Sequence, residues 1–299
     1  MEHSEFQQDP LHAGEHRVGD EQRLLERARK GNAFRALHQR EGAFIIPNPW
    51  DAGTARLLAH LGFEALASTS AGFAFSMGRE DYKVERGEMM VHIASLAVAT
   101  TLPVSADLEN GFGDEPEAVA QTIVLAAASG VVGGSIEDAT GRPDEPIYEL
   151  AHAVERVRAA AEAARALSFP FTLTARAENY LVGRADLQDT IRRLQAYQEA
   201  GADVLYAPGL TSREDIAAVV NSLDHPVNVL AGVKGMQLSA ADLSALGVKR
   251  ISVGGSLARA ALGAFLRAAQ EMRDQGTFTF TRDAVSYADL SAIFKEFDR

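Results

Sequence analysis

The chain has 299 residues, 46% of them apolar, and a formal net charge of -12 at pH 7. This length and apolar content allow either one α/β barrel or two smaller domains. The acidic balance, without any cluster of Lys or Arg, argues against nucleic acid or an anionic membrane as a partner and favours a small-molecule substrate.

Cysteine and long apolar runs are both missing from the sequence. The lack of cysteine excludes disulfides, thiolate metal ligands and a cysteine nucleophile. No apolar run approaches the roughly 18 residues that a membrane span needs, and the first residues lack the basic-then-apolar pattern of a signal peptide. We therefore expect a cytoplasmic protein that has no membrane partner.

The first forty residues divide into a polar segment and a helical one. Residues 1–19 are polar, include His3, His12 and His16, and show no periodicity that could bury a face, so they predict a mobile tail. Residues 21–40 carry apolar side chains at helical spacing, interrupted at Gly31, which predicts one or two leading helices that cover the lower end of the fold.

Eight strand-like apolar segments follow from residue 43 onward. They cover residues 43–47, 63–69, 103–107, 131–137, 171–176, 202–206, 227–230 and 250–253. Helical patterns alternate with them at residues 51–61, 87–99, 115–128, 148–167, 186–200, 212–221, 240–246 and 256–274. Because each parallel strand needs a crossover helix, eight repeats predict a (β/α)8 TIM barrel, with a doubly wound open sheet as the alternative.

One more helical segment lies beyond the eighth repeat. Residues 275–299 place Leu290, Ile293 and Phe297 at apolar spacing but have no strand of their own. We expect this C-terminal helical tail to pack on a partner subunit. Residues 20–299 are thus predicted to form a single barrel domain that includes both terminal helical segments.

Acidic side chains stand at the end of the third predicted strand. The segment around Asp107 and Glu109 continues into two glycines, Gly111 and Gly113, which reads as a buried strand opening into a tight loop. Catalytic groups of barrel enzymes lie at this end of the strands. Side chains two apart in a strand project to one side, and carboxylate oxygens placed that way suit Mg²⁺ or Mn²⁺. A solvated strand end is the alternative interpretation.

Other strand ends carry polar groups that would face the same mouth. They are Thr69, Ser70 and Ala71 with Gly72, Glu137 with Asp138, Arg176 with Glu178, and Asn228. Carboxylates around a cation, an arginine able to bind a carboxylate through two nitrogens, and exposed backbone amides would together accommodate a small acid. Arg176 has a second interpretation, in which it only neutralises Glu137 or Asp107 as a structural ion pair.

Several of these motifs, in this order, resemble the isocitrate lyase/phosphoenolpyruvate mutase superfamily over about residues 43–270. The motifs are residues 48–51, 69–72, 78–81, 105–113, 136–138 and 175–176. The resemblance implies a (β/α)8 barrel whose last helix is exchanged between subunits of a homodimer or homotetramer. It also implies chemistry that makes or breaks a carbon–carbon or carbon–phosphorus bond next to a 2-oxo acid through an enolate.

The resemblance further implies a role for each motif residue. Asp107 would ligate Mg²⁺ directly, while Glu109 and Glu137 would hold its water shell. Thr69, Ser70 and Ala71 would present hydroxyl and backbone donors to the substrate, and Asp81 would lie near the reacting centre. Arg176 and Asn228 would bind carboxylate oxygens of the substrate. The implied catalytic set is therefore Asp81, Asp107, Glu137 and Arg176.

The sequence departs from the superfamily after the Glu-Asp pair. Lyases that cleave isocitrate or methylisocitrate carry a Lys-Lys/Arg-Cys-Gly-His loop there, whose cysteine is the general acid, whereas residues 139–146 of this chain contain no cysteine. The asparagine and lysines of the phosphoenolpyruvate mutase loop are missing as well. The short loop is similar to that of carboxyphosphonoenolpyruvate mutase-like and decarboxylase-like members, and oxaloacetate decarboxylation tolerates the lost acid best.

We therefore expect a Mg²⁺-dependent enzyme that cleaves a carbon–carbon bond of a small 2-oxo or 2-hydroxy acid. Phosphonate-forming mutase chemistry is the second choice, and a barrel that binds a 2-oxo acid without turnover is a third. A Schiff-base aldolase is the fourth, because Lys234 follows the seventh predicted strand and Gly254 and Gly255 could hold a phosphate after the eighth.

Overall fold

Eight parallel strands form the centre of the molecule, as the sequence predicts. The computed structural model of the chain describes residues 10–298. The strands are β1 (Phe44–Ile46), β2 (Leu66–Ala67), β3 (Val104–Asp107), β4 (Gly133–Glu137), β5 (Thr172–Arg176), β6 (Val204–Tyr206), β7 (Val227–Leu230) and β8 (Arg250–Ser252). Their order is β1-β8-β7-β6-β5-β4-β3-β2, and Ala67 N donates to Pro47 O at 3.1 Å across the remaining seam. This nearly closed sheet confirms the (β/α)8 barrel and excludes the open sheet.

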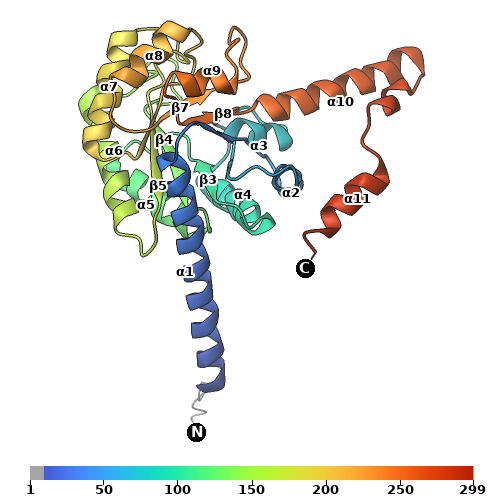
Figure 1. Ribbon diagram of the computed structural model, residues 1–299, viewed down its shortest axis with the longest axis horizontal. Coiled ribbons are helices and arrows are strands. Elements are labelled where there is room, and N and C mark those ends of the chain that lie inside the picture. Colours follow the sequence, from blue (N-terminus) through green and yellow to red (C-terminus); the bar gives the residue numbers. More distant parts are fainter. Residues whose placement is uncertain (1–9, 299) are drawn as a thin grey trace, which may run out of the picture.

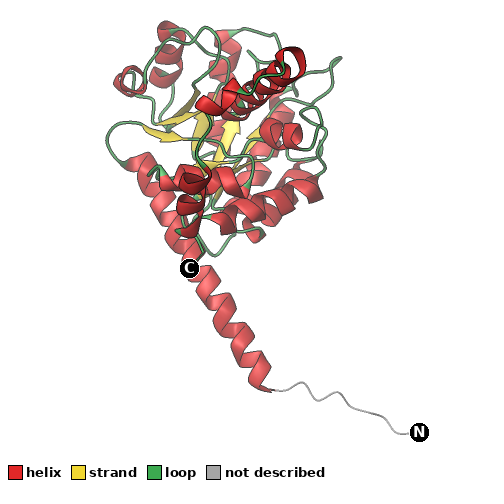
Figure 2. Cartoon of the chain, turned by 90° about the vertical axis from the view of Figure 1, so that its right-hand side faces the viewer, coloured by secondary structure: helices red, strands yellow, loops and turns green. Residues whose placement is uncertain are grey.

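The helices surround the strands (Figures 1 and 2). They are α1 (Pro10–Gln39), α2 (Ala52–His60), α3 (Ser70–Ser76), α4 (Arg86–Ala99), α5 (Pro116–Ala128), α6 (Leu150–Arg165), α7 (Leu187–Ala200), α8 (Arg213–Asn221), α9 (Ala240–Ala245), α10 (Ser256–Gln275) and α11 (Tyr287–Lys295), with a 3₁₀ turn at Thr279–Arg282. All expected crossover helices are present, but α3 was not predicted, because its seven residues are too short to show a period. No described helix is long and apolar enough to cross a bilayer.

Helix α1 is longer and more continuous than the sequence predicts. It begins at Pro10, so residues 10–19 of the predicted tail are helical, while residues 1–9 lie outside the described part of the chain. The helix also continues through Gly31, where we expected an interruption. A Cβ at Gly31 would lie 2.2 Å from Pro170 O, so this glycine permits close packing of α1 on the segment before β5. Phe34 of α1 is fully buried against that end of the barrel, which confirms the expected position of the helix.

His38 of α1 is buried between two aromatic rings at the amino-terminal end of the barrel. Its ring meets Phe34 and Phe44 edge-on, with centroids 4.8 and 5.0 Å away, and only 6% of the residue is exposed. Burial, with the nearby Arg250 as a second cause, lowers the pKa of His38 to about 3. The neutral imidazole therefore belongs to the folded state.

Lowering the pH should destabilise the protein through His38. The imidazole of His38 takes up a proton near pH 6.5 in the unfolded chain but only near pH 3 in the folded chain. The free energy of unfolding is therefore unaffected by His38 above pH 6.5 and falls as the pH drops below that value. Between pH 6.5 and 5 the loss from this residue is about 2 kcal/mol. Urea unfolding of wild type and His38→Gln at both pH values measures it, and an equal pH dependence in the two proteins would contradict it.

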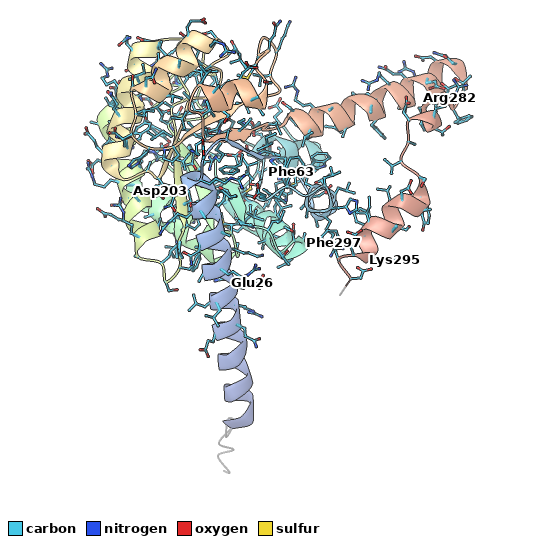
Figure 3. The ribbon with its side chains drawn as sticks, viewed as in Figure 1. Glu26, Phe63, Asp203, Arg282, Lys295 and Phe297 are labelled. Carbon is cyan, nitrogen blue, oxygen red and sulfur yellow. The ribbon has the colours of Figure 1, made fainter. Side chains whose placement is uncertain are left out.

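The C-terminal part departs from the ordinary barrel arrangement. Helix α10 extends away from the barrel (Figure 1) instead of packing along it, and Ala258 is its only fully buried residue. The chain then returns, and the region of Lys295 and Phe297 lies near α2 (Figure 3), where Arg56 stands over the Phe297 ring at 5.7 Å. The expected terminal helix is confirmed as α11. Helix exchange between subunits stays a prediction.

Candidate active site at the carboxyl ends of the strands

A pocket of about 170 Å³ lies at the carboxyl ends of the strands. It brings together seven of the predicted site residues, Thr69, Ser70, Ala71, Asp81, Asp107, Arg176 and Asn228. Glu109 and Glu137, the other two, do not line the pocket but are buried beside it. The strand ends therefore converge as the sequence predicts.

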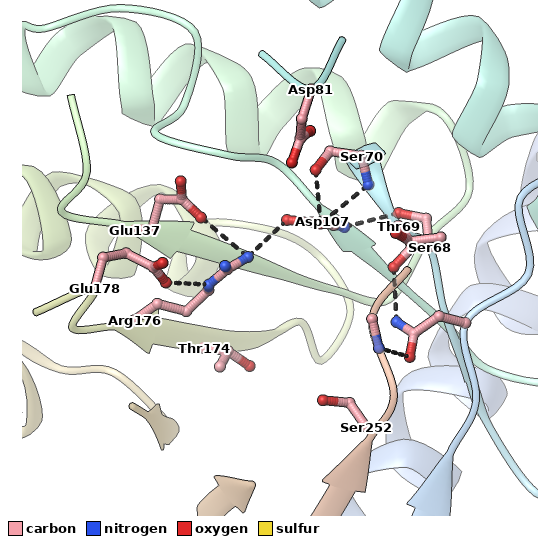
Figure 4. A network of polar contacts seen from close by, with 12 residues as sticks. Ser68, Thr69, Ser70, Asp81, Asp107, Glu137, Thr174, Arg176, Glu178 and Ser252 are labelled. Carbon is pink, nitrogen blue, oxygen red and sulfur yellow. Dashed lines mark hydrogen bonds and ion pairs between the residues drawn. The ribbon is translucent and has the colours of Figure 1, made fainter. Parts of the chain in front are cut away.

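Asp107, at the end of β3, is held from three sides (Figure 4). Its Oδ2 accepts hydrogen bonds from the backbone N and the Oγ of Ser70, both at 3.0 Å, and its Oδ1 accepts from Arg176 Nη1 at 2.9 Å. Its backbone N donates to Ser68 Oγ at 2.8 Å. The carboxylate is thus fixed before any ligand arrives.

Arg176, at the end of β5, binds three carboxylates. Its Nη1 lies 2.9 Å from Asp107 Oδ1 and 3.0 Å from Glu137 Oε2, and its Nε donates to Glu178 Oε1 at 2.8 Å. The side chains of Glu137 and Glu178 are 2% exposed, so this arginine offsets buried negative charge. The geometry supports the ion-pair interpretation, and the substrate-binding role of Arg176 stays a prediction.

Tyr82, which the sequence analysis missed, contacts the same cluster. Its hydroxyl hydrogen-bonds Glu137 Oε1, and its backbone lies in the left-handed region with φ of 61°. Burial is the main cause that raises the pKa of Glu137 well above its usual value. Only the position of Tyr82 directly after Asp81 could have indicated this role, because its partner lies 55 residues away in sequence.

Glu109 follows β3 in a left-handed conformation, with φ of 49°. Its Oε1 is buried without a hydrogen-bond partner, and burial together with the charges of Asp107 and Asp81 raises its pKa to about 8. Burial and Asp107 also raise the pKa of Asp81. Such mutual repulsion is relieved by a cation, and a set made only of carboxylate oxygens fits Mg²⁺ or Mn²⁺.

Asp107, Glu109 and Glu137 do not form a direct three-ligand cage. Among residues 21–298, no group of three Asp, Glu, His or Cys side chains is arranged to hold a metal ion by itself. That arrangement is compatible with one direct carboxylate ligand and further carboxylates that bind through water, which is the usual coordination of Mg²⁺ in proteins. The donor chemistry of the site therefore fits the implied ion.

Helix α3 supplies the small polar residues of the pocket. Thr69 is its N-cap, whose Oγ1 accepts from Gly72 N at 3.2 Å, and Ser70 is its first residue. A Cβ at Gly72 would lie 2.6 Å from the Thr69 side chain, so the turn needs glycine at that position. This turn brings the start of α3 against Asp107.

Several other predicted groups take no part in the pocket. Lys234 is exposed and does not line it, which disfavours the aldolase. The backbone N atoms of Val253 and Gly254 donate to Asn48 Oδ1, both at 2.9 Å, so they are not free for a phosphate. Asp138 is turned away from the mouth, where it accepts from Tyr197 Oη at 2.5 Å.

Together these features define a (β/α)8 barrel with a small pocket, lined by both acidic and basic side chains, at the carboxyl ends of its strands. A family model described as phosphoenolpyruvate phosphomutase matches residues 34–273. The chain belongs to this family, within the isocitrate lyase/phosphoenolpyruvate mutase superfamily.

Curated relatives are similar over different lengths. An uncharacterized protein of Mycobacterium tuberculosis is 31% identical over 268 residues, which cover 89% of this chain and 97% of the relative. The oxaloacetate decarboxylase of Chromohalobacter salexigens is 27% identical, with 81% and 85% of the two chains covered. The 2-methylisocitrate lyase of Escherichia coli is 31% identical, with 60% and 62% covered.

Two solved structures show the same fold. A protein of Burkholderia cenocepacia described as a candidate lyase/mutase is 66% identical, with a TM-score of 0.88 and 90% and 96% of the chains covered. Oxaloacetate acetylhydrolase in complex with its product oxalate is 26% identical, with a TM-score of 0.79 and 89% and 94% covered. These relatives support an enzyme of the lyase and mutase type.

Proposed function

We propose that this protein is a Mg²⁺- or Mn²⁺-dependent enzyme that cleaves a carbon–carbon bond of a small 2-oxo or 2-hydroxy acid, with oxaloacetate decarboxylation as its first candidate reaction. The observation that carries this proposal is the pairing of Asp107 and Glu137 with Arg176, with Glu109 buried nearby, at a pocket of about 170 Å³. The relatives that act on oxaloacetate support the substrate class.

The chain's own residues suit this chemistry. Asp107 would hold the cation, with Glu109 and Glu137 acting through water, and the bound ion would supply Lewis acidity next to the oxygen that becomes negative. Ser70 fixes Asp107 through two hydrogen bonds, and Arg176 keeps positive charge beside the acid groups. Asn228 would bind a substrate carboxylate through its amide. Such pre-set charges and dipoles favour a developing enolate oxygen without reorganisation.

Phosphonate-forming mutase chemistry is the second candidate, because the matching family model describes a phosphomutase. Asn48 already binds the amides of Val253 and Gly254 that could otherwise hold a phosphate group. Carbon–carbon cleavage therefore ranks first.

Assembly into a homodimer or homotetramer is part of the proposal. Helix α10 leaves Phe265 68% exposed and Leu266 56% exposed, on an element that extends away from its own barrel (Figure 1). Large apolar side chains gathered in this way typically mark a protein interface. The exposed face supports the helix exchange that the resemblance implies.

Removing the divalent ion should abolish binding of oxalate. Two oxygens of oxalate, one from each carboxylate, can chelate a cation at Asp107, so affinity without the ion would depend on weaker polar contacts alone. Calorimetric titration of oxalate with Mg²⁺, and again with excess EDTA, measures this difference. Asp107→Asn should lose the Mg²⁺-dependent affinity, whereas Asp274→Asn, on exposed α10, should keep it. Equal affinity with and without EDTA would overturn the proposed function.

A further inference from the structure

The barrel interior is unusually polar one layer below the candidate active site. Two residues before Asp107, Glu137 and Arg176, their strands carry Ser105, Ser135 and Thr174, respectively. Residues two apart in a strand point to the same side, so these three side chains also face the barrel interior, one layer below the mouth. Barrel interiors are ordinarily filled by bulky branched side chains at such positions. Ser105 and Ser135 line the same pocket as Asp107. The pocket therefore continues downward from the acid cluster.

Arg250, the first residue of β8, reaches into this deeper layer. Its Nε donates to Asn228 Oδ1 at 2.9 Å, and its Nη2 donates to Thr174 Oγ1 at 3.0 Å. Asn228 in turn donates to Ser252 Oγ at 3.0 Å. Figure 4 shows Thr174 and Ser252 on the opposite side of Asp107 from Asp81. The guanidinium is thus held in place by neutral groups from two other strands, β5 and β7.

The third nitrogen of this guanidinium is unused. Arg250 is 5% exposed, lines the pocket, and its Nη1 is buried without any hydrogen-bond partner. Among the side chains of residues 21–298, no carboxylate lies within 4.0 Å of it. Partly buried Arg176 and buried Arg193 each bind two or more carboxylates, and buried Arg156 is bound by backbone carbonyls.

An unpaired buried cation of this kind is costly to the folded protein. A buried charge is tolerated when it is paired and hydrogen-bonded, and Arg250 has only one amide and one hydroxyl oxygen as partners. The carboxylates of Asp107, Glu137 and Glu178 are paired with Arg176 at the mouth and do not offset the charge of Arg250. The lower part of the pocket therefore has an unmatched positive charge that suits an anion.

We propose that Arg250 forms a second anion subsite, which binds the distal carboxylate of a dicarboxylate substrate through Nη1, with Ser105 and Ser135 as neighbouring hydroxyl donors. This inference rests on the proposed function, because the other end of the same molecule would bind at Asp107 and Arg176. The subsite names the substrate class as a small acid with a second carboxylate beyond the reacting carbons. A monocarboxylate of equal length would leave Nη1 unpaired.

Calorimetry with Mg²⁺ and a matched pair of four-carbon ligands tests the subsite. The pair is 3,3-difluorooxaloacetate, which has the distal carboxylate, and 2-oxobutyrate, which lacks it. The affinity for oxalate measures binding at the Asp107 end of the pocket alone. Wild type should bind the diacid at least about tenfold more tightly than 2-oxobutyrate, as expected for a hydrogen bond to a charged group. Arg250→Gln should abolish this preference and leave oxalate affinity within about twofold. Lys249→Gln, which removes a half-buried charge from the neighbouring residue outside the pocket, should keep the preference.

The outcomes separate this proposal from the proposed function. A wild type without preference for the diacid, or an Arg250→Gln variant that keeps it, overturns the subsite. If wild type binds oxalate but does not prefer the diacid, only the Arg250 subsite is overturned. If wild type binds the diacid through Arg250 but does not bind oxalate, only the proposed metal-dependent function is overturned. If Arg250→Gln does not fold, a crystal structure of the wild-type diacid complex decides. A carboxylate oxygen within about 3.2 Å of Nη1 supports the subsite, and a water molecule there overturns it.

Discussion

Replacement of Arg176 by alanine should lower the free energy of unfolding by about 3–5 kcal/mol, the usual effect of leaving buried charges without their partner. Glu137 and Glu178 are buried beside this arginine, and Asp107 is 18% exposed. Without the guanidinium, their charges would repel one another where solvent screening is weak. Urea unfolding measures the change. A loss below about 1 kcal/mol would show that these carboxylates are protonated or solvated in the folded protein.

Arg176→Lys separates the structural role from the substrate role. Lysine keeps the charge but cannot serve several oxygens through a planar fork. If Arg176 also binds substrate, oxalate affinity should fall by roughly 1.5–3 kcal/mol while most of the stability remains. Arg193→Lys is the matched control, because Arg193 is a buried arginine bound to Asp138 and Asp189 that does not line the pocket. It should lower stability without lowering oxalate affinity, and unchanged affinity in Arg176→Lys would leave Arg176 a purely structural role.

Local patterns were enough to predict the barrel and most of its mouth. Each strand is short and apolar, each crossover helix has its own period, and parallel strands bring their carboxyl ends to one side of the sheet. The positions of Asp107, Glu137 and Arg176 therefore followed from where their strands end. The position of Asn228 could be predicted as well, because the repeat places β7 between β6 and β8 in the barrel.

Contacts between distant segments could not be predicted in the same way. Arg250 lies in a predicted strand, but its importance depends on Thr174, 76 residues earlier, and on a missing carboxylate that no local pattern reveals. Tyr82 depends on a left-handed backbone and a partner on β4. Helix α10 follows β8 as a crossover helix would, so its position in the chain did not indicate that it extends away from the barrel.

The loop after β4 decides which cleavage reactions the site can support. Ala139 and Ile147 pair across the base of the loop, Thr140 Oγ1 bonds within it, and Arg142 Nη1 donates to Asp114 at 2.9 Å. No residue of the loop lines the pocket. Thr140, which could have replaced the missing cysteine as proton donor, is therefore used within the loop itself.

Oxaloacetate decarboxylation should exceed cleavage of 2-methylisocitrate by at least about a hundredfold in kcat/KM, the lower range of what a positioned general acid contributes. Cleavage of 2-methylisocitrate leaves a succinate carbanion that a nearby acid must protonate, and residues 139–146 place none in the pocket. Decarboxylation releases CO₂, and water can later protonate the pyruvate enolate. Coupled assays with the same enzyme, Mg²⁺ and pH measure both rates. Comparable rates would show that another residue supplies the proton, while no turnover of either acid would favour a barrel that binds a 2-oxo acid without reacting.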